Sequence, residues 1–191
     1  MVRAVVVYES IYGNTRVVAE AIAAGLGDHA DVIVRRVADA DAETLQGARL
    51  LVVGGPTHLH GLATSLSRRM AVKAAEEDGH TGVEPQAAEG PGLRAWLSEL
   101  AGGDLSAAAF DTRIDRSAAL TGAAARGIAR RLQRRGCTLV AEPESFFVED
   151  SEGPLEEGEI ARARAWGASL AARVDPEGAS FVSNDGEGAG S

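Results

Sequence analysis

Two short, continuous runs of apolar residues limit the folds open to this chain. Residues 4–8 read Ala-Val-Val-Val-Tyr, and residues 50–54 read Leu-Leu-Val-Val-Gly. Short apolar runs that are rich in valine and have no polar alternation are typical of strands buried on both faces, as in a parallel sheet. A sheet with one solvated face would alternate apolar and polar residues instead. We therefore expect a parallel sheet that is covered by helices.

Segments with a helical period separate these runs. Val18, Ile22 and Leu26 lie at positions i, i+4 and i+8, one stripe of a helix, and Asn14 or Thr15 is a candidate N-cap. The other predicted helices cover residues 62–77, 93–100, 124–132 and 160–174. The other predicted strands cover residues 31–37 and 107–110, and a fifth strand covers 138–140 and 145–148 with a break near Pro143. This alternation predicts an α/β fold, a doubly wound five-stranded parallel sheet of order 2-1-3-4-5 with helices on both faces.

The chain is expected to form one domain. It has 191 residues, of which 45% are hydrophobic, and this suits a single compact core. Residues 79–92 are rich in Gly, Glu and Pro and lack periodicity, so we interpret them as a flexible insertion. Residues 175–191 are rich in Gly, Ser and acids, with Phe181 as a large anchor, which is typical of a disordered tail. The predicted domain covers residues 1–174.

Charge and cysteine content narrow the classes of partner. A formal net charge of −9 argues against a nucleic-acid partner, because binding to a phosphate backbone needs a basic patch. Cys137 is the only cysteine, which excludes a disulfide within the chain and a thiolate metal cluster. No apolar run reaches the roughly 18 residues of a membrane span, and the first residues do not resemble a signal peptide. We expect a cytoplasmic protein with neither a nucleic-acid nor a membrane partner.

A tight polar turn joins the first predicted strand to the first predicted helix. It reads Ser10-Ile11-Tyr12-Gly13-Asn14-Thr15. At such a junction backbone N–H groups converge at the positive end of the helix dipole, and Gly13 lets the backbone approach a ligand closely. No lysine-bearing triphosphate motif and no Gly-x-Gly-x-x-Gly follows this strand. The turn therefore suits one terminal phosphate group, such as that of FMN, although an ordinary helix N-terminus with a glycine turn is the alternative.

The predicted strand order places two more segments beside this turn. In the order 2-1-3-4-5 the ligand crevice lies at the carboxyl ends of strands one and three. Residues 56–61 then lie beside residues 10–15, and residues 111–114 come next along the edge. The candidate cofactor-binding residues in these two segments are Pro56, Thr57, His58, Leu59, Gly61, Asp111, Thr112 and Arg113.

These motifs resemble those of the flavodoxin family. Val-Val-Tyr-Glu-Ser-Ile-Tyr-Gly-Asn-Thr, residues 6–15, is similar to the family signature that wraps the FMN phosphate. Residues 52–58 and 109–113 are similar to the family's second and third flavin loops, and the order fits over residues 3–174. The resemblance implies non-covalent FMN, no catalytic side chain and no metal. It also implies electron exchange with a redox partner protein or a small-molecule acceptor, by a monomer or homodimer.

One departure from the family keeps two other functions open. Flavodoxins often sandwich the flavin ring between aromatic side chains, but aromatic residues make up 4% of this chain and residues 56–61 and 111–114 include none. An NAD(P)H-dependent FMN quinone or other reductase is the first alternative, and it differs in that NADH or NADPH alone would bleach the flavin. A non-redox module that has lost its cofactor is the second, and it would stay colourless with FMN. For Trp96 and Cys137 we expect places in the core.

Overall fold

The computed structural model describes residues 2–58, 61–62, 73, 84, 90–115, 123–150 and 152–174. The elements in chain order are β1 (Val2–Tyr8), α1 (Asn14–Gly27), β2 (Ala30–Arg36), the 3-10 turn η1 (Val37–Asp39), β3 (Leu50–His58), β4 (Gly61–Leu62), α3 (Leu93–Glu99), β5 (Ser106–Ile114), α5 (Ala124–Arg134), β6 (Thr138–Leu139), β7 (Glu144–Val148) and α6 (Glu159–Val174).

The sheet has the predicted order. Its strands run β2-β1-β3-β5-β6, and β7 also pairs with β5. All these pairs are parallel, with Thr138 of β6 opposite Ser106 and Glu144 of β7 opposite Phe110. β6 and β7 therefore share the fifth position, one after the other, with the predicted break at Pro143 between them. The order 2-1-3-4-5 is confirmed.

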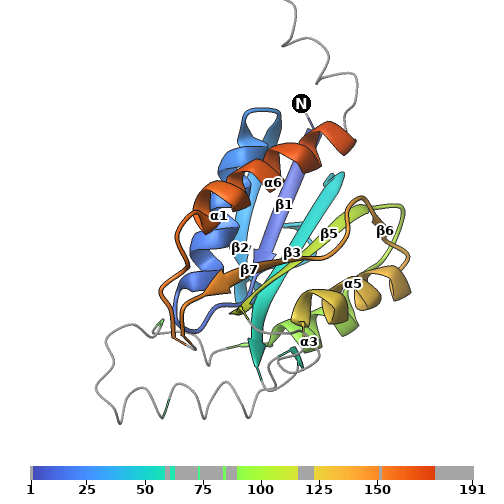
Figure 1. Ribbon diagram of the computed structural model, residues 1–191. Helices are drawn as coiled ribbons and strands as arrows, with labels where there is room; N and C mark the ends of the chain where they lie inside the picture. Colours follow the sequence, from blue (N-terminus) through green and yellow to red (C-terminus); the bar gives the residue numbers. More distant parts are fainter. Residues whose placement is uncertain are drawn as a thin grey trace, which may run out of the picture.

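Helices cover both faces of the sheet in two pairs, with α1 and α6 together on one side and α3 and α5 on the other (Figure 1). Alternate residues of β1 divide between the two cores. Val5 and Val7 pack with residues of α3 and α5, whereas Ala4 and Val6 pack with residues of α1 and α6. All four are fully buried, which explains why the sequence of β1 shows no polar alternation.

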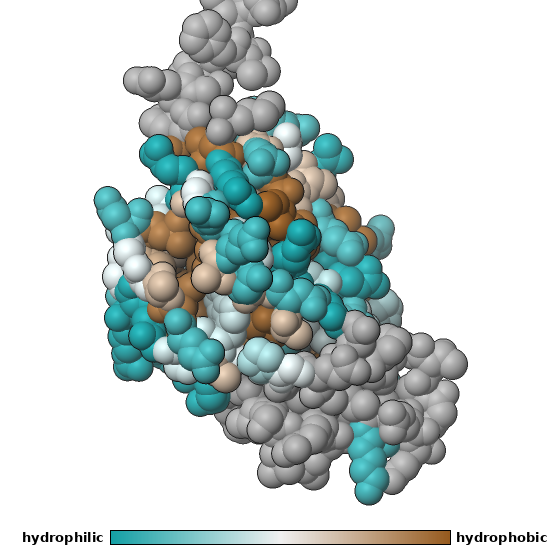
Figure 2. Space-filling view, turned by 180° about the vertical axis from the view of Figure 1, so that it is seen from behind, coloured by the Kyte–Doolittle hydropathy of each residue, from teal (hydrophilic) through white to brown (hydrophobic). Residues whose placement is uncertain are grey.

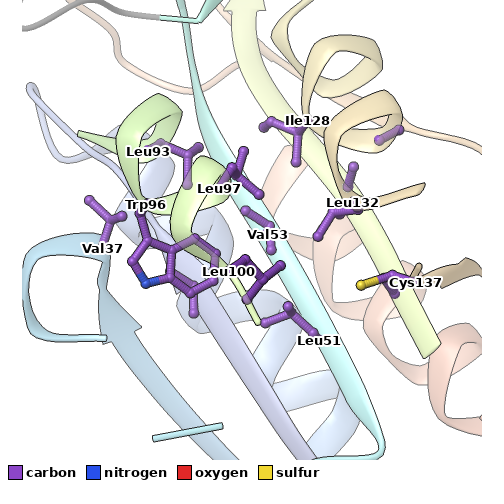
Figure 3. Close-up of a cluster of buried hydrophobic side chains, with 14 of the residues drawn as sticks. Val37, Leu51, Val53, Leu93, Trp96, Leu97, Leu100, Ile128, Leu132 and Cys137 are labelled. Carbon is purple, nitrogen blue, oxygen red and sulfur yellow. The ribbon is translucent and has the colours of Figure 1, made fainter. Parts of the chain in front are cut away.

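Trp96 and Cys137 lie in the core beneath α3 and α5, as expected (Figure 3). The ring of Trp96 is 8% exposed, and its Nε1–H donates to the carbonyl of Ala40 at 2.7 Å, so its polar atom is satisfied away from the predicted site. Cys137 is buried among Leu97, Leu132 and their neighbours, and burial raises the pKa of its thiol. Both side chains therefore serve packing.

Three aromatic rings form the centre of the opposite core. Phe110, Phe146 and Trp166 meet edge to face, with ring centroids 6.1–6.4 Å apart. A Cβ at Gly54 would lie 2.0 Å from the ring of Phe110, so only glycine leaves room for this cluster on the neighbouring strand. Much of the chain's small aromatic content is thus used for packing.

Two strands extend further than the sequence predicts. Residues 55–56 pair with residues 111–112, so the segments expected as loops are the last residues of β3 and β5. Pro56 is tolerated because the pairing of β1 with β3 ends at Tyr8 and Gly54, which leaves that side of β3 without a ladder. The predicted helix start at Leu62 is wrong, because Leu62 belongs to β4, which pairs antiparallel with β3.

Several predicted segments fall largely outside the described residues. They are the rest of the helix over 62–77 apart from Lys73, the insertion over 79–92 apart from Glu84 and residues 90–92, and the tail over 175–191. The insertion, the tail and the domain limit at residue 174 stay predictions.

Apolar residues on the face seen in Figure 2 form separate patches with hydrophilic residues between them. Among the helices of the described part, none is long and apolar enough to cross a bilayer.

α1 and α6 pack closely because each carries a glycine at their contact. A Cβ at Gly25 would lie 2.0 Å from the carbonyl oxygen of Arg164, and a Cβ at Gly167 would lie 2.2 Å from that of Ile22. Gly27, two residues beyond Gly25, has nothing within 4 Å of such a Cβ. The helix pair therefore depends on the absence of a side chain at Gly25 and Gly167.

We expect Gly25→Ala to lower the free energy of unfolding by about 1–3 kcal/mol or more, because the added methyl group forces α6 away from α1. The matched control Gly27→Ala should be neutral or stabilising by up to about 1 kcal/mol, since alanine is the better helix former. Urea denaturation measures both. Equal changes in the two variants would contradict the close helix contact.

Candidate functional site

A small cavity opens at the carboxyl edge of the sheet, where β1, β3 and β5 end. Its volume is about 90 Å³. Residues from all three predicted segments line it, together with Val148, which the sequence did not single out: Ile11, Tyr12, Asn14, Thr15, Pro56, Thr57, Thr112, Arg113, Ile114 and Val148. Ser10, Gly13 and Asp111 are not among the residues that line it. Leu59 and the side chain of His58 fall outside the described residues, and Gly61 is described only as part of β4.

The turn before α1 is shaped by Gly13 and Ser10. Gly13 is the N-cap residue and has a left-handed conformation, with φ 82° and ψ −19°, which favours glycine. Its N–H donates to Ser10 Oγ at 3.1 Å. The prediction that Asn14 or Thr15 caps the helix is therefore wrong, because both residues already belong to the helix. Ser10 instead accepts the hydrogen bond from the N-cap residue, Gly13.

Polar side chains at the carboxyl edge satisfy the first amides of α3 and α5. The N–H of Leu93 donates to Glu9 Oε2 at 3.0 Å. At α5, the N–H of Ala124 donates to Thr57 Oγ1 and that of Ala125 donates to Asp111 Oδ2, each at 2.9 Å. These contacts supply hydrogen bonds that the first turn of a helix cannot make internally.

Asp111 acts through Thr57, which lines the cavity. It is fully buried, and its Oδ2 also accepts a hydrogen bond from Thr57 Oγ1 at 2.9 Å. The single hydroxyl proton of Thr57 is thus committed to Asp111, and Thr57 offers the cavity no donor from its side chain. In this structure Asp111 joins β3, β5 and α5.

The first amides of α1 differ from those of α3 and α5 because no side chain in the described part accepts their hydrogen bonds. In the part of the chain that the structure describes, the N–H groups of Asn14 and Thr15 have no hydrogen-bond acceptor, and both residues line the cavity. The hydroxyls of Thr15 and Thr112 lie 2.7 Å apart and are buried. Unpaired amides at a helix N-terminus, next to hydroxyl groups, favour an anion.

Arg16 adds little net positive charge to this turn. Its Nε lies 2.7 Å from Glu84 Oε1, and its Nη1 lies 3.0 Å from Glu20 Oε1. The N–H of Glu84 also donates to the carbonyl of Ile11 at 2.8 Å. The hydrogen-bond donors that the turn offers to a ligand are therefore neutral groups. Glu84, from the segment interpreted as an insertion, contacts this turn. Nothing in the sequence around Glu84 indicated this contact.

Arg113 lies at the other side of the cavity. Its guanidinium carbon is 5.0 Å from the ring centroid of Phe147, a cation–π distance. Tyr12 is the aromatic residue among those that line the described cavity. Val148, at the end of β7, was missed by the sequence analysis, although the rule that ligands bind at carboxyl ends applies to the fifth strand as well.

The described residues contain no group of three or more His, Cys, Asp or Glu side chains that could hold a metal ion.

Both tyrosines of the chain lie near this turn, and both have raised pKa values. Burial, followed by the charge of Glu84, raises the pKa of Tyr8; burial, followed by the charge of Glu152, raises that of Tyr12. The folded protein therefore holds the phenolic protons more tightly than the unfolded chain.

We expect phenolate absorbance at 295 nm to appear in the folded protein only above the ordinary pKa of 10.0. The stability associated with these neutral phenols should be fully present below pH 10.0 and fall as the pH rises through the folded pKa values. Titration in buffer and in denaturant checks this. The same midpoint in both would contradict the burial of the phenols.

Comparisons with known proteins agree with the strand order described above. The family model for flavodoxin matches residues 6–166. Among solved structures, the fold is similar to a flavodoxin from the domain Archaea (TM-score 0.60, 19% identity, 91% of this chain and 99% of that chain).

Two further solved structures share the fold. A flavodoxin described as a WrbA-like protein, from Agrobacterium tumefaciens, gives a TM-score of 0.59 at 19% identity and covers 92% of this chain and 99% of that chain. Oxidised flavodoxin 2 from Bacillus cereus gives 0.58 at 20% identity, with 88% and 97% covered. No curated protein sequence matches this chain. By its family match, its strand order and its turn before α1, this chain belongs to the flavodoxin family.

Proposed function

We propose that this chain binds FMN non-covalently at the carboxyl edge of its sheet and serves as an electron carrier. In this proposal the phosphate lies at the turn formed by residues 10–15. The remaining contacts come from the ends of β3 and β5 and from the residues that follow β3 in the sequence: Pro56, Thr57, His58, Leu59, Gly61, Asp111, Thr112 and Arg113. Asp111 contributes by holding Thr57 and α5.

One contrast between helices carries the proposal. The first amide of α3 is satisfied by Glu9, and the first two amides of α5 are satisfied by Thr57 and Asp111. Within the described residues, the N–H groups of Asn14 and Thr15 at the start of α1 have no acceptor, and both residues line a cavity. Unpaired amides at the N-terminus of a helix favour an anion. Their position at this cavity supports a ligand that accepts hydrogen bonds.

The size and charge of the cavity support a phosphate monoester. About 90 Å³ is well below the roughly 300–1,000 Å³ of a complete small-molecule pocket, so the described cavity accounts for the phosphate end of a nucleotide. A cradle of neutral donors suits a single phosphate group. A triphosphate would favour a lysine or arginine free of competing carboxylates, whereas Arg16 is paired with Glu20 and Glu84.

When bound, FMN supplies the redox chemistry by accepting and releasing one or two electrons. The chain's own residues would bind and orient it: the amides of Asn14 and Thr15 and the hydroxyls of Ser10 and Thr15 would hold the phosphate. Arg113 places a positive charge beside the site, which favours negative charge on a neighbouring ligand. A redox partner protein or a small-molecule acceptor would receive the electrons, with the chain acting as a monomer or a homodimer in the cytoplasm.

We expect Thr15→Ala to weaken FMN binding by about 1.5–3 kcal/mol, the value of a hydrogen bond to a charged group, which is roughly one to two decades in Kd. Riboflavin lacks the phosphate, so its Kd should barely change. Fluorescence titration with both ligands measures the difference. Thr138→Ala, an exposed threonine of β6, is the control. A variant that loses both ligands equally would show that Thr15 does not contact the phosphate.

A further inference from the structure

A turn far along the chain also reaches the phosphate-binding turn. It follows β7 and is closed by hydrogen bonds from the N–H of Glu149 to the carbonyl of Pro154 at 2.9 Å and from the N–H of Gly153 to that of Asp150 at 3.0 Å. Val148 at its start and Leu155 at its end form an antiparallel bridge. The turn is thus held to β7 independently of the residues before α1.

The contact itself is made by Asn14. Its Nδ2 donates to the carbonyl of Glu152 at 2.8 Å, across 138 positions of sequence. The charge of Glu152 also contributes, after burial, to the raised pKa of Tyr12. The side-chain amide of Asn14, the first residue of α1, is therefore committed to the backbone of this turn.

Gly153 packs directly against that amide. A Cβ at Gly153 would lie 2.6 Å from both Nδ2 and Oδ1 of Asn14 and 3.0 Å from its Cγ. The φ of Gly153 is +107°, a conformation that side chains other than glycine rarely adopt. Glycine is therefore required here for two separate reasons, backbone conformation and space for Asn14.

We propose that Gly153 is a positioning residue that sets the selectivity of this site for a phosphorylated flavin, by fixing Asn14 at the start of α1. With its side chain held between Gly153 and the Glu152 carbonyl, Asn14 keeps its backbone N–H aimed into the cavity. A side chain at Gly153 displaces Asn14 and with it this donor. The inference rests on the proposed function, because it assumes that FMN occupies the cavity.

The chain offers a matched control for the backbone effect. Gly158 also has a left-handed φ, +87°, but nothing lies within 4 Å of a Cβ placed there. Gly153→Ala and Gly158→Ala both place a Cβ on a residue with positive φ, and only the first collides with Asn14. The double variant Asn14→Ala with Gly153→Ala removes the collision while it keeps the Cβ on a residue with positive φ.

The experiment measures Kd for FMN and for riboflavin in the wild-type protein and in the variants, with thermal unfolding to verify folding. Gly153→Ala should weaken FMN at least about tenfold and leave riboflavin nearly unchanged, whereas Gly158→Ala should leave the ratio of the two affinities at the wild-type value. In the Asn14→Ala background, Gly153→Ala should have no further effect on that ratio. If Gly153→Ala alone fails to fold, Asn14→Ala decides, because loss of the side chain that Gly153 and the Glu152 carbonyl hold should by itself lower the FMN-to-riboflavin ratio, and an unchanged ratio overturns the inference.

The outcomes distinguish a failure of the inference about Gly153 from a failure of the proposed FMN binding. A wild-type protein that binds FMN, with equal FMN-to-riboflavin ratios in Gly153→Ala and Gly158→Ala, overturns this inference and leaves the proposed function intact. A change in the ratio that persists when Asn14 is alanine overturns it as well, since Gly153 would then act by another route. A wild-type protein that binds no FMN overturns the proposed function, and the inference with it.

Discussion

The interior position of β1, paired in parallel with β2 on one side and β3 on the other, determines where the functional residues lie. Chain connections leave in opposite directions on either side of β1, and in such a sheet the ligand crevice lies at the carboxyl ends of the two strands where the order reverses, here β1 and β3. The turn before α1 emerges into this space. The ends of β3 and β5 border it because their register carries the pairing on to Pro56 and Thr112.

The polar groups at this edge have two roles: some hold helices against the sheet, and others are available to a ligand. Glu9, Thr57 and Asp111 are polar residues in or near the flavin motifs, yet in this structure they hold α3 and α5 against the sheet. In the described part, the amides of Asn14 and Thr15 at the start of α1 are left without an acceptor. A site of neutral donors is preorganised in this way, since no group has to be displaced when an anion arrives.

The sequence predicts the fold well because its signals are local. The apolar runs of β1 and β3 and the glycine turn before α1 each fit within ten residues, and right-handed crossovers then fix the strand order. What could not be predicted depends on contacts between distant residues. By its residue type alone Asn14 is a candidate helix cap, but its side chain donates to the carbonyl of Glu152, 138 positions away. Likewise, the sequence placed Asp111 in a loop, and its role depends on the distant amide of Ala125 and hydroxyl of Thr57, which both donate to it.

The most direct test of this account is gel filtration of the purified protein after incubation with FMN or with an equal concentration of riboflavin, followed by visible absorption spectra of the protein fraction. The account predicts that flavin absorbance elutes with the protein after FMN and is much weaker after riboflavin, because the phosphate supplies most of the contacts at the turn before α1. A protein fraction without flavin absorbance after FMN, or with equal absorbance after both ligands, would contradict a phosphate-binding role for that turn.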